Sequence, residues 1–227
     1  MDEAFGRRVT RLGALADPVR RALYRFVAEQ PGAVSRDQAA SGVEVPRHTA
    51  KFHLDRLVEE GLLVTEFKRL TGRTGPGAGR PAKLYRRSGR EVVVSVPSRR
   101  YDLAGQVLAD AVERNLAGAP MPDALAAAAD HAARSVAEEW PAARDGLAAT
   151  LTMLGYEPLA SGAGIRLRNC PFGRLAAEHR DLVCGVNHAF VAALARRLDR
   201  ADLTAEPVAP GRGCCVVLRG AEAAGVS

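Results

Sequence analysis

Two short helical patterns separated by a tight turn restrict the fold of this chain more than any other feature. The first starts with Ser35 and Gln38, whose spacing forms a capping box at the beginning of a helix. The second runs from about Pro46 to about Glu60 and is followed by a glycine, which commonly ends a helix. Residues 41–45 join the two patterns. This spacing is typical of a helix-turn-helix, in which the second helix lies in the major groove of DNA.

A rotation of 100° per residue divides the second helix into a hydrophobic side and a polar, basic side. Ala50, Leu54 and Leu57 share the hydrophobic side. Phe52 lies opposite, where an apolar side chain can contact a thymine methyl group in the major groove. The alternative is that Phe52 packs beneath the following hairpin. The candidate groove-facing residues are Arg47, His48, Thr49, Lys51, Phe52 and Arg56.

A basic, glycine-rich segment between two predicted strands indicates a wing. Residues 62–67 form the first strand pattern and residues 84–86 begin the return strand. Basic side chains in such a hairpin suit DNA phosphates, and Arg80 with the following proline suits a minor groove. The alternative is a flexible surface loop without a partner. The candidate wing contacts are Arg73, Arg80 and Lys83.

Charge is distributed unevenly along the chain. Residues 1–100 carry 20 Lys and Arg against 11 Asp and Glu, whereas residues 101–227 carry 12 against 15. A basic first half indicates a polyanion partner, here double-stranded operator DNA, that is held by one end of the protein. Neither an apolar run of membrane-spanning length nor a signal-peptide pattern is found, so we expect a cytoplasmic protein without membrane contact.

Three segments follow one another in an α+β arrangement. We expect a winged helix-turn-helix DNA-binding domain at residues 6–95, a helical linker or dimerisation segment at residues 99–154, and a small α+β domain with cysteine ligands at residues 155–219. An apolar stripe in the middle segment is either core or a dimer seam. A twofold DNA site needs two copies, which favours a homodimer. The stripe contains Leu103, Ala104, Val107, Leu108, Ala111, Val112 and Leu116.

All four cysteines lie in the last quarter of the chain, at Cys170, Cys184, Cys214 and Cys215. Gaps of 13 and 29 residues do not fit a zinc finger but suit a site assembled by the fold. Thiolates are the soft ligands of iron–sulfur clusters and zinc. Adjacent strand residues point to opposite faces, so we expect three thiolates and a different fourth ligand. His188, or else His179, is the candidate; redox thiols without metal and inert core cysteines are the alternatives.

Three motifs resemble the winged-helix regulators of the ArsR superfamily. They read LADPVR at residues 15–20, HLDRLVEEGLLV at residues 53–64, and GRPAKLY at residues 79–85. The last motif, together with the cysteine pattern, is similar to the SufR-type branch of repressors that sense iron–sulfur clusters. The resemblance covers nearly the whole chain and implies a homodimeric repressor with a cluster in its C-terminal domain. Members of that branch with four well-separated cysteines differ from this chain, in which two cysteines are adjacent.

Other functions have little support in the sequence. The chain contains no phosphate-binding loop and no Gly-x-Ser-x-Gly nucleophile motif, so we do not expect an enzyme. Two alternatives stay open. One is a winged-helix regulator that binds a small-molecule effector or zinc without a cluster, and the other is a cysteine-dependent enzyme.

Overall fold

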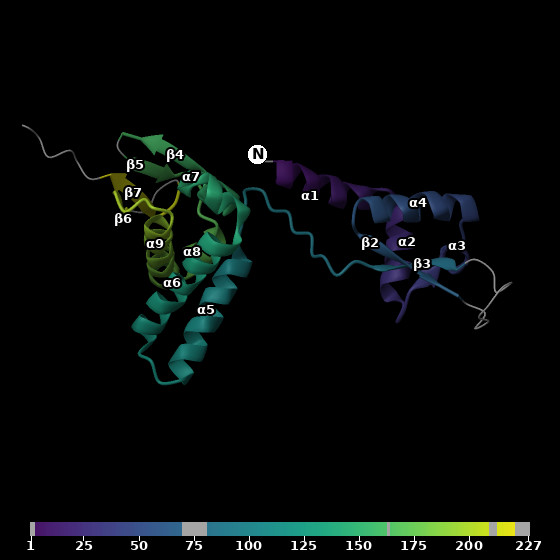
Figure 1. Ribbon diagram of the computed structural model, residues 1–227, viewed down its shortest axis with the longest axis horizontal. Coiled ribbons are helices and arrows are strands. Elements are labelled where there is room, and N and C mark those ends of the chain that lie inside the picture. The colour runs from purple at the N-terminus through teal and green to yellow at the C-terminus, as the bar shows by residue number, and fades with distance from the viewer. Residues whose placement is uncertain (1–2, 70–80, 163, 209–212, 221–227) are drawn as a thin grey trace, which may run out of the picture. The chain divides into compact units, whose positions relative to one another are not determined.

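The computed structural model describes residues 3–69, 81–162, 164–208 and 213–220. Helices and strands are mixed, and the chain divides into two compact units, Met1–Val94 and Ser95–Ser227. Figure 1 shows both units, each of which combines helices with one small sheet. Within the described residues, no helix has the length and apolar character needed to cross a membrane.

The N-terminal unit is a winged helix-turn-helix. Asp17 caps α2 by accepting a hydrogen bond from the Arg20 backbone N–H at 2.8 Å, and both bonds of the predicted Ser35–Gln38 capping box are present. The three strands pair antiparallel in the order β1-β3-β2. The elements are α1 (Glu3–Gly13), a 3-10 turn (Ala14–Ala16), α2 (Pro18–Glu29), β1 (Val34–Ser35), α3 (Arg36–Gly42), α4 (Arg47–Glu59), β2 (Leu63–Lys68) and β3 (Ala82–Arg87).

The core of this unit orients α4. Leu54 and Leu57 of α4 are fully buried with Leu23 and Val27 of α2, and Tyr85 of β3 closes the same cluster. Burial of such apolar side chains contributes roughly 1.5–3 kcal/mol each. These buried side chains hold one side of α4 against the core, so the opposite side of the helix faces solvent.

The C-terminal unit combines helices with a four-stranded antiparallel sheet of order β4-β5-β7-β6. The expected segments 99–154 and 155–219 both fall in this unit and share one hydrophobic core. Its elements are α5 (Tyr101–Leu116), α6 (Met121–Glu139), a 3-10 turn (Pro141–Asp145), α7 (Leu147–Met153), β4 (Pro158–Ser161), β5 (Gly164–Leu167), α8 (Gly173–Glu178), α9 (Arg180–Arg197), β6 (Leu203–Pro207) and β7 (Val216–Gly220).

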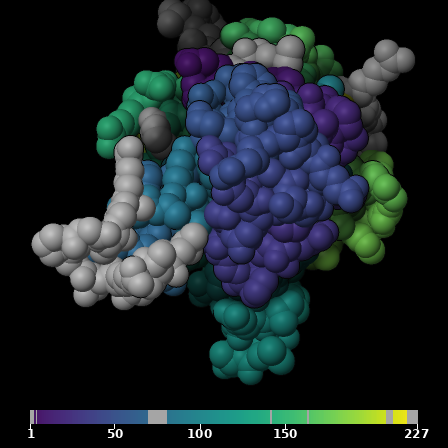
Figure 2. Space-filling model, turned by 90° about the vertical axis from the view of Figure 1, so that its right-hand side faces the viewer, coloured from purple at the N-terminus to yellow at the C-terminus, as the bar shows by residue number. Residues whose placement is uncertain are grey.

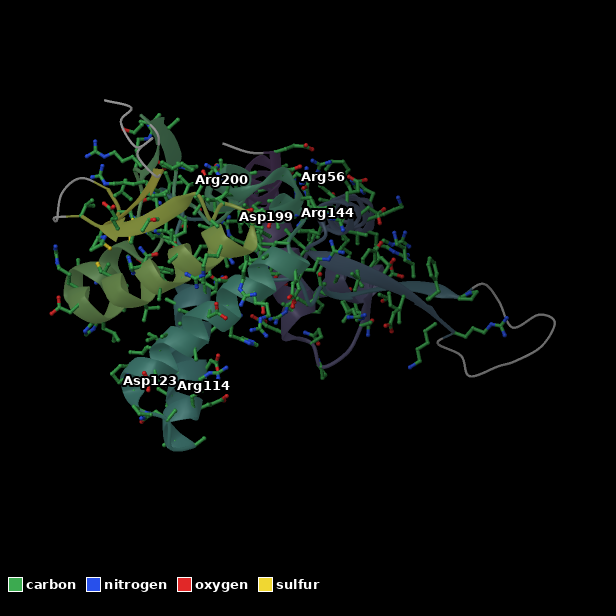
Figure 3. All side chains as sticks on the ribbon, turned by 60° about the vertical axis from the view of Figure 1, so that its left-hand side comes forward. Arg56, Arg114, Asp123, Arg144, Asp199 and Arg200 are labelled. Carbon is green, nitrogen blue, oxygen red and sulfur yellow. The ribbon has the colours of Figure 1, made fainter. Side chains whose placement is uncertain are left out.

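The apolar stripe of α5 divides between core and surface. α5 and α6 form a hairpin, so that Arg114 and Asp123 lie at the same end of the pair (Figure 3). Four stripe residues, Leu103, Ala104, Val107 and Ala111, are buried in the core of their own unit. Val112 and Leu116 are exposed. The first part of the stripe is thus ordinary core, and only its end presents apolar side chains to solvent.

Candidate functional site

The outer side of α4 is an exposed, basic surface. The side chains of Lys51 and Arg56 are 60% and 46% exposed, and Phe52 is 65% exposed. This exposure places Phe52 on the surface rather than beneath the hairpin, and the edge of one ring meets the other where Phe52 contacts the buried His53. Figure 2 shows the residues of this unit, in purple to blue, as one broad surface, and Arg56 is labelled in Figure 3. Arg47, His48 and Thr49 lie in the first turn of α4, with Arg47 and His48 exposed.

Carboxylates accompany the basic side chains on this surface. Arg47 makes a two-pronged ion pair with Asp37 of α3. Arg56 binds Glu60 at 2.6 Å and Glu59 at 3.1 Å. The exposed Arg47–Asp37 and Arg56–Glu59 pairs contribute only about 0–1 kcal/mol each, so DNA phosphates can replace these two carboxylates as partners, whereas the Glu60 side chain is only 13% exposed.

Asp55 connects α4 to the wing strand β3. Its carboxylate accepts hydrogen bonds from Lys83 Nζ at 2.6 Å and Tyr85 Oη at 3.0 Å, and it pairs with Lys51 Nζ at 3.1 Å. Burial acts to raise the pKa of Asp55, but these three donors outweigh it and hold the pKa below its ordinary value. At neutral pH Asp55 is therefore a charged carboxylate between two candidate DNA-contacting lysines.

Replacement of Asp55 by asparagine is expected to strengthen binding of duplex DNA by roughly two- to fivefold at low salt, because a charge near the phosphates contributes up to about 1 kcal/mol in water. The asparagine oxygen can still accept from Tyr85, so the fold is retained. Fluorescence anisotropy with a labelled duplex measures the change, with Glu29→Gln at the end of α2 as the charge-matched control. Weaker binding by Asp55→Asn would instead mean that the carboxylate positions Lys51 and Lys83 for contact.

The wing is only partly described. Arg73 and Arg80 lie outside the described residues. Lys83 is exposed on β3, opposite Phe67 of β2, which is also exposed. The sequence analysis missed Phe67 as a surface aromatic residue beside the candidate wing contact.

The four cysteine sulfurs come together in the C-terminal unit. Cys170 follows β5, Cys184 lies in α9, and Cys214 and Cys215 directly precede β7 rather than opening it. Hydrogen-bond contacts join Cys214 to Cys170 and to Cys215, and join Cys184 to Cys215. Residues separated widely in sequence thus form one group of sulfur atoms, as the spacing of single cysteines indicated.

Gly213 lets the adjacent cysteines approach β5. Its φ of 127° lies in the region that favours glycine, and a Cβ atom there would lie 3.0 Å from the Leu167 carbonyl oxygen. The next residue, Cys214, donates its backbone N–H to that same oxygen at 3.0 Å. The cysteine pair is therefore held against the end of β5, from which Cys170 follows.

Three of the thiols line a pocket of about 290 Å³. Cys170, Cys184 and Cys215 face it, whereas Cys214 is buried behind them. The rest of the described lining is basic or neutral, and it contains no Asp or Glu. It consists of Arg99, Arg168, Asn169, Gly173, Ala176, Ala177, Arg180 and Gly213.

Contacts among the thiols, together with burial, leave two thiols with a lowered pKa and two with a raised pKa. Contact with Cys214 lowers the pKa of Cys170 and lowers the pKa of Cys215 to about 5. The same contacts raise the pKa of Cys214, and burial followed by contact with Cys215 raises the pKa of Cys184 to about 12. Cys170 and Cys215 are therefore the more acidic thiols of the group, and Cys184 and Cys214 are the less acidic ones.

Two buried polar side chains, Tyr156 and Asn187, form a chain of hydrogen bonds that ends at the sulfurs. The fully buried Tyr156 hydroxyl donates to Asn187 Oδ1 at 2.6 Å, which orients the amide. Asn187 Nδ2 then donates to Cys214 Sγ at 3.1 Å and lies 3.9 Å from Cys215 Sγ. Both residues escaped the sequence analysis, although Asn187 follows Cys184 by three positions and so lies on a neighbouring part of the helix face.

The two histidine candidates lie elsewhere. His188 Nε2 donates to the Ala205 carbonyl oxygen of β6 at 2.9 Å, and His179 is an exposed residue that precedes α9. In the part of the chain that the structure describes, no three His, Cys, Asp or Glu side chains are arranged around a single metal position. The thiols contact one another in a row, so their side chains would have to rotate to surround a metal.

Comparison with known families bears on the N-terminal unit. A family described as a helix-turn-helix domain matches residues 15–66. The chain therefore contains a helix-turn-helix domain over these residues. No curated protein and no solved structure matches the chain.

The helix-turn-helix domain indicates a DNA-binding transcriptional regulator, a class that is generally not enzymatic. The match spans α2, α3, α4 and part of β2, and it includes every candidate groove contact on α4. Lys83 and the cysteines lie outside it.

Proposed function

We propose that this regulator is a homodimeric repressor whose cysteine site holds an iron–sulfur cluster, so that cluster or redox status controls operator binding. One observation carries the proposal: four cysteine sulfurs from three separated chain segments gather beside arginines. Soft thiolates suit iron–sulfur clusters and zinc, and nearby guanidinium groups compensate the negative charge of several thiolates. Zinc is the alternative occupant.

The residue types present suit such a group, and rotation of the cysteine side chains about their own bonds would be needed to bring the sulfurs around one position. Cys170, Cys184 and Cys215 would hold it from the pocket side. Cys214, which contacts two of these sulfurs, is better placed as the fourth ligand than His188, whose Nε2 is bonded to a carbonyl. A bound cluster would supply a change in charge that depends on iron and oxidant supply. The Asn187 amide, oriented by Tyr156, would donate a hydrogen bond to the sulfurs.

A set of hydrogen bonds connects the Cys170 loop to the segment that begins this unit. Arg99 Nη1 donates to Asn169 Oδ1 at 2.6 Å and to the Cys170 carbonyl oxygen at 3.0 Å. Asn169 Nδ2 donates to the Ser98 carbonyl oxygen at 2.9 Å, and the Arg100 N–H donates to the Pro171 carbonyl oxygen at 3.0 Å. A change at Cys170 would therefore shift the segment directly after the helix-turn-helix unit, which ends at Val94.

This segment is where the cysteine site would influence DNA binding. A dimer places two recognition helices about one helical turn apart on DNA, so a modest change at each connecting segment alters their spacing. A coupling of about 1–3 kcal/mol is enough for such a switch. The exposed Val112 and Leu116 of α5 offer apolar area for the second copy.

Anaerobic purification tests the cluster directly. We expect a brown protein with a visible absorption spectrum and bound iron, and we expect Cys170→Ser and Cys184→Ser each to abolish both, because each removes one of the thiolate ligands. His188→Gln is the matched control and should retain colour and iron.

The other possible metal contents of the wild-type protein and its variants distinguish between the alternatives. Stoichiometric zinc without iron would establish the alternative occupant. A colourless, metal-free wild-type protein would contradict a metal site, as would full iron retention in both cysteine variants. Loss of iron in His188→Gln would assign the fourth position to His188.

A further inference from the structure

We propose that the pocket is also a thiol-modification site in the metal-free protein, where Cys215 reacts with anionic low-molecular-weight disulfides and Cys184 then forms an internal disulfide with it. The inference concerns the protein without metal and does not depend on a cluster. It follows from the charge of the pocket and from the order in which its sulfurs contact one another.

The pocket selects for negative charge. Three guanidinium groups line it beside the three thiols, and the described lining contains no carboxylate. Arg180 precedes Cys184 by four residues on α9 and so shares its helix face. Arg99 is held in place by its bonds to Asn169 and to the Cys170 carbonyl oxygen. The carboxylates of an anionic disulfide would be attracted here, and an ammonium group would be repelled.

The pocket is open and small. Its volume of about 290 Å³ suits one arm of a small peptide disulfide rather than a protein segment. Cys170, Cys184 and Cys215 are all partly exposed, whereas Cys214 is buried and bonded to Asn187. A reagent that enters from solvent therefore meets these three thiols but not Cys214. Of the three, Cys184 and Cys215 contact each other, whereas Cys170 contacts the buried Cys214, so Cys215, unlike Cys170, has a second pocket thiol beside it.

The reaction is two successive thiol–disulfide exchanges. Cys215, having released its proton to solvent, attacks one sulfur of the disulfide RSSR, which forms the mixed disulfide and expels one thiolate RS⁻. Cys184, which contacts Cys215, loses its proton and attacks the Cys215 sulfur, forming the Cys184–Cys215 bond and expelling the second RS⁻. The protein loses two electrons and the disulfide gains them, so RSSR is the only oxidant required.

The test uses the full chain, reduced and stripped of metal by a chelator. Oxidised glutathione is the anionic probe, cystamine the cationic probe and bis(2-hydroxyethyl) disulfide the neutral probe, with acid quenching and intact mass spectrometry as the readout. Rates are normalised to those of a free small thiol. We expect oxidised glutathione to react at least about tenfold faster than cystamine at low salt, and the difference to shrink as salt screens the arginines.

Substitution of arginine pairs inside and outside the pocket tests whether the pocket arginines cause the preference for the anionic disulfide. Arg168→Gln/Arg180→Gln should reduce the preference for oxidised glutathione by about fivefold or more, because two charges are removed from the pocket. Arg144→Gln/Arg196→Gln removes the same charge from exposed positions outside the lining and should leave the preference unchanged; Arg144 is labelled in Figure 3. Cys215→Ser should prevent the adduct, and Cys184→Ser should trap it as a stable mixed disulfide.

Several results would overturn the inference: equal effects of the two arginine pairs, adduct formation at the wild-type rate in Cys215→Ser, or release of the second thiolate at the wild-type rate in Cys184→Ser. Because every sample is metal-free, none of these results bears on the cluster. Conversely, a colourless protein in the iron experiment leaves this inference intact.

Discussion

Replacement of both Lys51 and Arg56 by alanine is expected to weaken operator binding by about a hundredfold or more, because each well-formed base or phosphate contact contributes roughly 1–3 kcal/mol. If both side chains contact phosphates, the slope of log Kd against log salt should fall by nearly two units, since each neutralised phosphate contributes about 0.9. Each single variant should show part of the loss. A salt series of gel shifts or anisotropy titrations measures both quantities.

The loss should not come from unfolding or from dissociation of the dimer. Both side chains are exposed, and of their carboxylate partners only Glu60 is largely buried, so their removal should lower stability by about 1–2 kcal/mol and leave the domain folded. Light scattering should give the same mass for the variants and the wild type. Arg25→Ala removes an exposed charge from α2, outside the helix-turn-helix pair, and serves as the control. Unchanged affinity in both single variants would refute the assignment of α4 as the recognition helix.

The recognition helix could be predicted closely because its signals are local. A helix expected from about Pro46 to Glu60 is observed at Arg47–Glu59, with Pro46 as its N-cap residue. The sides of α4 follow from its 3.6-residue period, so Leu54 is buried and Phe52 exposed as the rotation required. Neither result needs knowledge of a distant contact.

The cysteine site could be predicted only in part. Opposite directions for adjacent cysteines follow from extended backbone, and Cys215 does face the pocket while Cys214 faces the interior. Which of the two faces which way depends on how β7 pairs with β5 and β6. The sequence alone does not reveal that pairing.

Position on a helix face was not enough to choose between Asn187 and His188. Both follow Cys184 within one turn, but the neighbouring strand β6 provides a carbonyl at Ala205 that binds His188. Asn187 is left facing the sulfurs. Arg99 escaped notice for the same reason, since its partner Asn169 is 70 residues away in the chain and only the folded core brings them together.

Breaking the Tyr156–Asn187 hydrogen bond is expected to destabilise the C-terminal unit more than any surface change described above. Asn187→Leu removes the acceptor of a fully buried hydroxyl and the donor to Cys214, and each unsatisfied buried group costs about 1–3 kcal/mol. The free energy of unfolding should therefore fall by about 2–4 kcal/mol. Tyr156→Phe leaves Asn187 Oδ1 without its donor and should cost about 1–3 kcal/mol.

Urea unfolding of the reduced, metal-free protein measures these losses. Trp140 is the single tryptophan of the chain and lies in the C-terminal unit, so its fluorescence follows that unit alone. Thr152→Ala removes an exposed hydrogen bond to the Ala148 carbonyl oxygen and should change stability by less than about 0.5 kcal/mol.

The double variant decides whether the two residues act as a unit. Tyr156→Phe/Asn187→Leu should be destabilised by clearly less than the sum of the single losses, because the second substitution removes a polar group that the first has already left without a partner. Additive losses would mean that the two side chains stabilise the unit independently. In that case the amide orientation at Cys214 would not depend on Tyr156, and Tyr156 would be a packing residue instead of a support for the cysteine site.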